Sequence, residues 1–87
     1  MNAQQIQNIL CQNICKGFML YCKDHRLNIT QLFSNTKGKL VRQNVYAVAR
    51  GSKKYISTIA ICYLAELLNL NSPFQLEQYY LNSKITN

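Results

Sequence analysis

The first quarter of the chain repeats apolar residues with the period of an α-helix. Between residues 3 and 23, apolar side chains recur every three or four positions, and mostly Gln, Asn and Lys occupy the opposite side. The apolar stripe consists of Ala3, Ile6, Leu10, Cys11, Ile14, Cys15, Phe18, Tyr21 and Cys22. This pattern predicts one long amphipathic helix whose stripe faces a hydrophobic core.

A short helix and a turn are predicted next. Asn28 or Thr30 can cap a helix that runs through residues 31–34, because their side-chain oxygens can accept from free backbone N–H groups. Residues 35–38 read Asn-Thr-Lys-Gly, which is typical of a turn, and Gly38 can adopt a positive φ.

The run VRQNVYAVARG predicts a helix over residues 41–50 that Gly51 ends. Val41, Val45 and Val48 are spaced i, i+4 and i+7 and would face inward. The β-branched content makes a strand the main alternative, but the spacing favours a helix. The side chains that then point away from the valines are Arg42, Gln43, Tyr46 and Arg50.

Ser52 can cap a fourth helix that ends near residues 69–71. The apolar face of this helix comprises Ile56, Ile59, Ala60, Tyr63, Leu64, Leu67 and Leu68. Pro73 opens a last helical turn, and residues 83–87 have the pattern of a frayed tail. We therefore expect a single all-α domain of four to five helices over residues 1–87.

Charge changes the picture because it is unevenly placed. The formal net charge is +7, and no Asp or Glu occurs between His25 and Leu64. The basic residues of that stretch are Arg26, Lys37, Lys39, Arg42, Arg50, Lys53 and Lys54. A polyanion will attract such a segment.

Four cysteines raise the questions of disulfides and of a metal site. The N-terminus MNAQQIQN lacks the basic start and apolar core of a secretory signal, and three of the cysteines share the apolar stripe, so we expect reduced, buried thiols. Cys11, Cys15, Cys22 and His25 resemble a zinc set in composition only. On one helix Cys11 and Cys22 would lie ~16 Å apart, too far to share one metal ion.

The remaining composition predicts a cytoplasmic protein with no cofactor. No apolar run approaches the ~20 residues of a membrane span. His25 is the only histidine, and no Ser, Cys or carboxylate is spaced to form a triad or a general base with it. We expect no catalytic residues and no enzyme activity.

The order of features from Leu32 to Leu76 resembles the Cro/phage-repressor (XRE-type) helix-turn-helix family. The similar stretch is LFSNTKGKLVRQNVYAVARGSKKYISTIAICYLAELLNLNSPFQL, about half of the chain. Gly38 matches the turn glycine of the family, Gly51 the glycine that closes the recognition helix, and Ile59-Ala60 the start of the helix packed behind it. Two features depart from the family. The segment between the two glycines is about one residue longer, and Thr30-Gln31 stands where the family has Gln-Glu.

The resemblance implies a lambda-repressor-like fold, double-stranded DNA as partner and a homodimer. Helix 41–50 would enter the major groove, where Arg can pair with guanine and Gln or Asn with adenine. The implied base-reading residues are Arg42, Gln43, Asn44 and Tyr46. The implied phosphate-binding residues are Thr30, Gln31, Lys37, Lys39, Arg50, Ser52, Lys53, Lys54 and Tyr55. A small transcriptional regulator, such as a repressor, is the function that follows.

Three alternatives remain open. In the first, the basic helix over residues 41–50 is an ordinary solvated surface with no binding role. In another, the protein is an interaction module, either a phage-type inhibitor or an assembly subunit, that binds an acidic protein partner. In the third it is an antitoxin-like regulator that binds both DNA and a toxin. The aromatic and apolar residues Phe74, Tyr79, Tyr80 and Leu81 either close the core or form the homodimer seam, for which the first helix is a second candidate.

Overall fold

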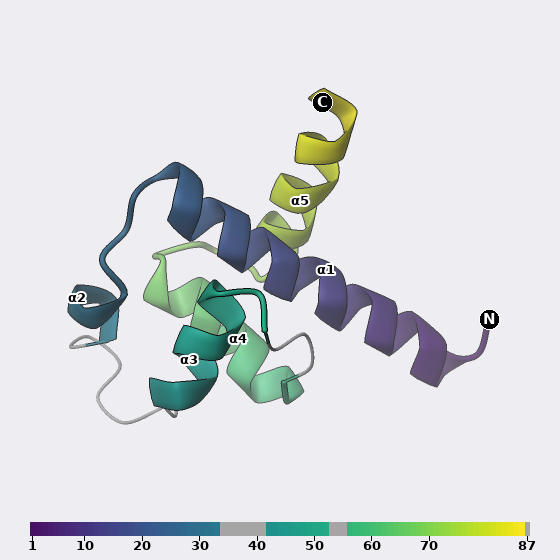
Figure 1. Cartoon of the computed structure of the whole chain (residues 1–87). Coiled ribbons are helices and arrows are strands. Elements are labelled where there is room, and N and C mark those ends of the chain that lie inside the picture. The colour runs from purple at the N-terminus through teal and green to yellow at the C-terminus, as the bar shows by residue number, and fades with distance from the viewer. Residues whose placement is uncertain (34–41, 53–55, 87) are drawn as a thin grey trace.

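The computed structural model describes residues 1–33, 42–52 and 56–86, and for residues 32, 33, 42 and 86 the backbone alone. The described residues form five helices and no strand, as the all-α prediction requires (Figure 1). The helices are α1 (Ala3–Asp24), α2 (Ile29–Phe33), α3 (Arg42–Ala49), α4 (Thr58–Leu67) and α5 (Phe74–Thr86).

Local hydrogen bonds fix both ends of the long helix α1. Asn2 and Gln5 form a capping box in which each side chain accepts from the backbone N–H of the other residue at 2.9 Å. At the far end Arg26 has a φ of 51°, a left-handed conformation that turns the chain away from the helix axis. The helix therefore ends at Asp24, one residue beyond the predicted end.

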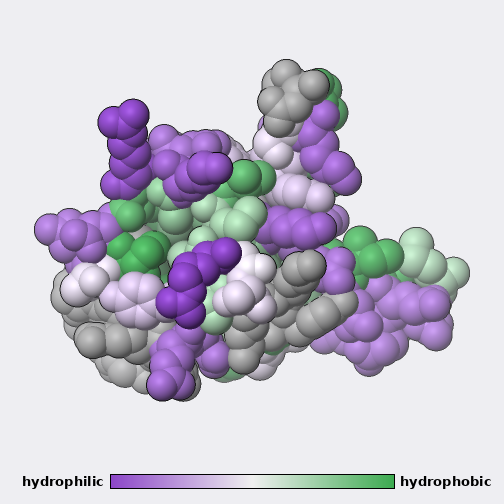
Figure 2. Space-filling view, in the orientation of Figure 1, coloured by the Kyte–Doolittle hydropathy of each residue, from purple (hydrophilic) through white to green (hydrophobic). Residues whose placement is uncertain are grey.

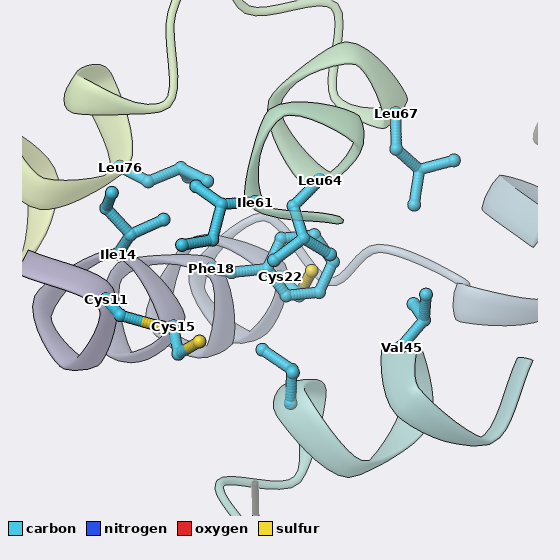
Figure 3. Close-up of a cluster of buried hydrophobic side chains, with 11 residues drawn as sticks. Cys11, Ile14, Cys15, Phe18, Cys22, Val45, Ile61, Leu64, Leu67 and Leu76 are labelled. Atoms are coloured by element: carbon cyan, nitrogen blue, oxygen red, sulfur yellow. The ribbon is translucent and has the colours of Figure 1, made fainter. Parts of the chain in front are cut away.

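The core lies between α1 and the other helices, with Phe18 fully buried at its centre (Figure 3). Its members are Cys11, Ile14, Cys15, Phe18, Cys22, Val45, Val48, Ile61, Leu64, Leu67 and Leu76. The inward stripe of α1 is thus confirmed from Cys11 to Cys22. It is wrong for Ala3 and Ile6, which are exposed because the N-terminal turns of α1 project beyond the body (Figure 1).

A glycine lets α5 cross α1 at very short range. A Cβ atom added to Gly17 would lie 1.9 Å from the carbonyl oxygen of Leu76, so no larger residue fits there. Around this crossing the Asn13 amide donates to Glu77 at 3.3 Å, and the Tyr79 hydroxyl donates to Asp24 at 2.6 Å. The ring of Tyr79 also meets the ring of Tyr21 edge-on, with centroids 5.3 Å apart.

Two sequence predictions about α4 are wrong. The cap is Ser57, whose hydroxyl accepts from the Ala60 N–H at 3.2 Å, and not Ser52. Cys11 fixes this later start, because its thiol bonds both the N–H of Ile56, at 3.4 Å, and the carbonyl of Ile56, at 3.5 Å. Ile59 then lies opposite Ile61 on the helix and is 63% exposed, instead of facing the core.

The C-terminal residues 83–86 belong to α5 and are not a frayed tail. Ser83 donates its hydroxyl hydrogen to the Tyr80 carbonyl at 2.6 Å, and Gln78 donates to Asn82 one turn away at 2.9 Å. Lys84 lies over the Tyr80 ring, 5.1 Å from its centroid. These local contacts extend α5 to Thr86, whereas the sequence predicted only one helical turn after Pro73.

Candidate nucleic-acid interface

Helix α3 has one buried face and one exposed face. Val45 and Val48 are each 1% exposed and point into the core, as the valine spacing predicted (Figure 3 labels Val45). Gln43 and Arg50 lie on the opposite side and are exposed, and Asn44 and Tyr46 are partly buried at the flanks. The side chain of Arg42 lies outside the described residues, although its backbone begins the helix.

A hydrogen bond between two hydroxyl groups joins α2 to α3. The Oγ1 atom of Thr30 lies 2.7 Å from the hydroxyl oxygen of Tyr46. Asn28 starts α2, because its side-chain oxygen accepts from the Gln31 N–H at 3.3 Å. Tyr46 was expected to read bases and Thr30 to bind phosphate, and the structure gives both a connecting role that the sequence did not reveal.

The end of α3 matches the expected glycine stop. Gly51 has a φ of +81°, and its N–H donates to the Val48 carbonyl at 3.0 Å. The N–H of Ser52 donates to the Ala47 carbonyl at 2.9 Å, and the Ser52 hydroxyl donates to the same oxygen at 3.1 Å. Ser52 thus lies at the carbonyl end of α3 and not at the N–H end of α4, so its implied role as a phosphate ligand gains no support from the free N–H groups of a helix.

The net charge of the chain belongs to the segment that contains α2 and α3. Residues 26–54 hold seven of the ten basic residues and no acidic one, and the other three, Lys16, Lys23 and Lys84, equal the three acidic residues in number. Two of the acids face the α1–α5 pair, since Asp24 accepts from Tyr79 and Glu77 accepts from Asn13. The predicted phosphate ligands that lie outside the described residues are Lys37, Lys39, Lys53, Lys54 and Tyr55.

Titratable groups away from α3 serve the packing. A hydrogen bond to Asp24 raises the pKa of Tyr79 to about 12. Burial acts to raise the pKa of Tyr80, but hydrogen bonds and charges from Lys16 and Lys84 outweigh it, so the pKa is lowered. Burial raises the pKa of the Cys15 and Cys22 thiols to about 12, which leaves them protonated at neutral pH and poor nucleophiles.

Neither a metal cluster nor a membrane span is found in the part of the chain that the structure describes. No three His, Cys, Asp or Glu side chains there are grouped so that they could share a metal ion. Cys11, Cys15 and Cys22 are buried, as predicted, while Cys62 is exposed on α4. No helix within the described ranges is long and apolar enough to cross a bilayer.

One cavity was not predicted from the sequence. It has a volume of about 330 Å³ and lies between α1, the end of α3 and α5. Its lining consists of Cys15, Lys16, Met19, Leu20, Val48, Gly51 and Tyr80. No sequence signal marks it, because it arises where three helices separated along the chain meet.

Comparisons of the chain with models of known protein families, with curated proteins and with solved structures find no match.

Proposed function

We propose that the protein binds double-stranded DNA with sequence preference, as a homodimer, and that it regulates transcription. The observation that carries the proposal is the division of α3. Its valines are buried, and Gln43 and Arg50 are exposed on the opposite face, within the segment that holds the whole net charge. A helix that is anchored on one side and polar and acid-free on the other suits the major groove.

Residues near the start of α3 are the proposed readers of base edges. Arg42, Gln43 and Asn44 occupy the first turn of the helix, the part that meets bases when such a helix enters the groove. Ala47 lies one turn beyond Gln43 and adds little bulk, so it leaves room for close approach to the groove floor. The Thr30–Tyr46 bond would hold α2 in place beside the reading helix.

Lysines on both sides of α3 are the proposed phosphate ligands. Lys37 and Lys39 precede the helix, and Lys53 and Lys54 follow it. Each phosphate contact releases counterions, so affinity falls with salt at about 0.9 logarithmic units per contact per tenfold change in salt. Such contacts set position and carry no sequence information.

The test is selection of bound sequences from a random duplex pool, followed by titration of the selected and random duplexes over a salt series. We expect enrichment of a defined site and a steep loss of affinity with salt. Gln43→Ala should reduce the preference for the selected site, and Gln4→Ala, an exposed glutamine on α1, is its control.

Two lysine variants separate reading from phosphate binding. Lys53→Ala should weaken binding to all duplexes evenly and lower the salt slope by about 1, while Lys23→Ala on α1, outside the basic segment of residues 26–54, should not. Binding that ignores salt, or retention of an acidic protein with no retention of duplex, would overturn the proposal in favour of a protein-interaction module.

A further inference from the structure

Helix α5 has a second apolar stripe on the side that faces away from α1. Leu76 is fully buried at the Gly17 crossing, but Phe74 is 57% exposed, Leu81 37% and Ile85 80%. At 100° per residue, these three residues and Gln78 align on the face opposite Leu76. Figure 1 shows the C-terminal half of α5 projecting from the body, and Figure 2 shows hydrophobic surface near its outer end.

We propose that this stripe, Phe74, Gln78, Leu81 and Ile85, pairs antiparallel with the same stripe of a second copy of the chain. The inference deepens the proposed homodimer by naming its surface, and it does not require that the protein binds DNA.

The spacing of the stripe reads the same from both ends. Its intervals are four, three and four residues, the spacing of the core positions of a coiled coil. A two-fold axis between residues 79 and 80 would place Phe74 against the partner's Ile85, and Gln78 against the partner's Leu81. A symmetric dimer interface requires this property, because each contact must recur with the roles of the two copies exchanged.

The charged residues beside the stripe favour the antiparallel arrangement. Glu77 and Lys84 are seven residues apart and so lie on the same flank. Equivalent flanks meet when two helices pair antiparallel. The Glu77 carboxylate, one oxygen of which accepts from Asn13 of its own chain, would then face the partner's Lys84, which gives two pairs of opposite charge. A parallel pair would instead set Glu77 against the partner's Asn82 and provide no such pair.

The placement of net charge also favours self-association through α5. Two copies with a net charge of +7 repel each other most where that charge is concentrated, in residues 26–54. Helix α5 carries one Glu and one Lys and is therefore neutral. The pairing surface is small, a single helix from each copy, so we expect a dissociation constant on the order of micromolar.

The experiment is sedimentation equilibrium of the whole chain, without DNA, over a micromolar concentration series. The expected result is a monomer–dimer equilibrium that Leu81→Glu shifts at least about tenfold toward monomer, with helicity unchanged by circular dichroism. Ile59→Glu is the control, since Ile59 is also open to solvent, at 63% exposed, but lies on α4.

A charge exchange tests the orientation and guards against misfolded variants. Glu77→Lys alone and Lys84→Glu alone should each weaken the dimer, and the double variant should restore it. A chain that stays monomeric throughout the series overturns the proposal. So does a dimer that tolerates Leu81→Glu but is lost in Ile6→Glu, which would assign the interface to α1.

The two proposals fail separately. A chain that dimerises through α5 but retains no duplex overturns the DNA-binding proposal alone. A chain that binds duplex and remains a monomer overturns the α5 pairing and the homodimer, and leaves the DNA-binding proposal standing.

Discussion

The α1–α5 pair and the α2–α3 pair are held together in different ways. Helix α5 crosses α1 at a glycine, with Leu76 buried and with Asn13–Glu77 and Tyr79–Asp24 hydrogen bonds beside the contact. Helices α2 and α3 are joined by a hydrogen bond between the hydroxyl groups of Thr30 and Tyr46. The first pair has a net charge of only +1, from Lys16, Lys23 and Lys84 against Asp24 and Glu77, and its helices pack closely. The second lies in the segment with the excess charge and offers an exposed polar face.

Stability and the proposed binding therefore depend on separable parts of the chain. Changes at the α1–α5 crossing should unfold the protein, whereas changes on the outer face of α3 should alter binding and leave the fold intact.

Gly17→Ala should lower the free energy of unfolding by about 2 kcal/mol or more, because the added methyl group would collide with the Leu76 carbonyl. A loss of stability would be diagnostic of the close crossing, since Gly→Ala within a helix usually stabilises a protein by about 1 kcal/mol. Urea unfolding measures the change, and Cys15 and Cys22 should also become accessible to a thiol reagent. Asn8→Ala, on the exposed part of α1, is the control, and a stabilised Gly17→Ala protein would contradict the close crossing.

Val48→Ala should cost about 2 kcal/mol, from the lost burial of two methyl groups and the cavity they leave. Gln43→Ala, on the opposite face of the same helix, should change stability by less than about 0.5 kcal/mol. Chemical denaturation of both variants measures the change in the free energy of unfolding. Equal losses would show that α3 does not have one structural and one free face.

Thr30→Val and Tyr46→Phe should each cost about 0.5 kcal/mol, at the low end for a hydrogen bond because this one is exposed to water. The double variant should cost little more than either single one, since both remove the same bond. A double-mutant cycle by urea unfolding measures the coupling. Strict additivity would mean that the bond does not join α2 to α3.

Tyr79 should make stability fall at high pH. Its folded pKa of about 12 exceeds the ordinary value of 10, so the unfolded chain loses this proton first and stability declines as pH rises between these two values. Urea midpoints across this range should decline less steeply in Tyr79→Phe. Tyr80→Phe should have the opposite effect, because the pKa of Tyr80 is lowered and its ionisation favours the folded state. If stability fell equally steeply with pH in the unchanged protein, in Tyr79→Phe and in Tyr80→Phe, the Asp24 contact would not be the cause of the decline.

Periodicity made α1 and α3 predictable, because a helix with one buried face has a repeating pattern that needs no knowledge of its neighbours. Cys11, Phe18 and Val45 were assigned to the core on this basis, and all three are buried. The glycine that ends α3 was predicted for a related reason, since a positive φ is a local property.

Contacts between distant segments were not predictable in the same way. Ser52 and Ser57 are both suitable caps, and the choice depends on hydrogen bonds from Cys11, which lies on another helix. Helix α5 was predicted too short because it has apolar residues on two faces, which blurs the helical period. The Thr30–Tyr46 bond and the cavity behind α3 depend on packing that no single segment encodes.

Gly51 affects which side chains of the proposed reading helix, α3, face outward. Its positive φ ends α3, and a Cβ atom at this position would lie only 2.7 Å from the Met19 sulfur on α1. The end of α3 and the contact with the Met19 side chain therefore meet at one position that has no side chain. One residue inserted between Val48 and Gly51 would add about 1.5 Å of helix and demand a rotation of about 100°. The length of α3, as much as its chemistry, thus determines which of its side chains face outward.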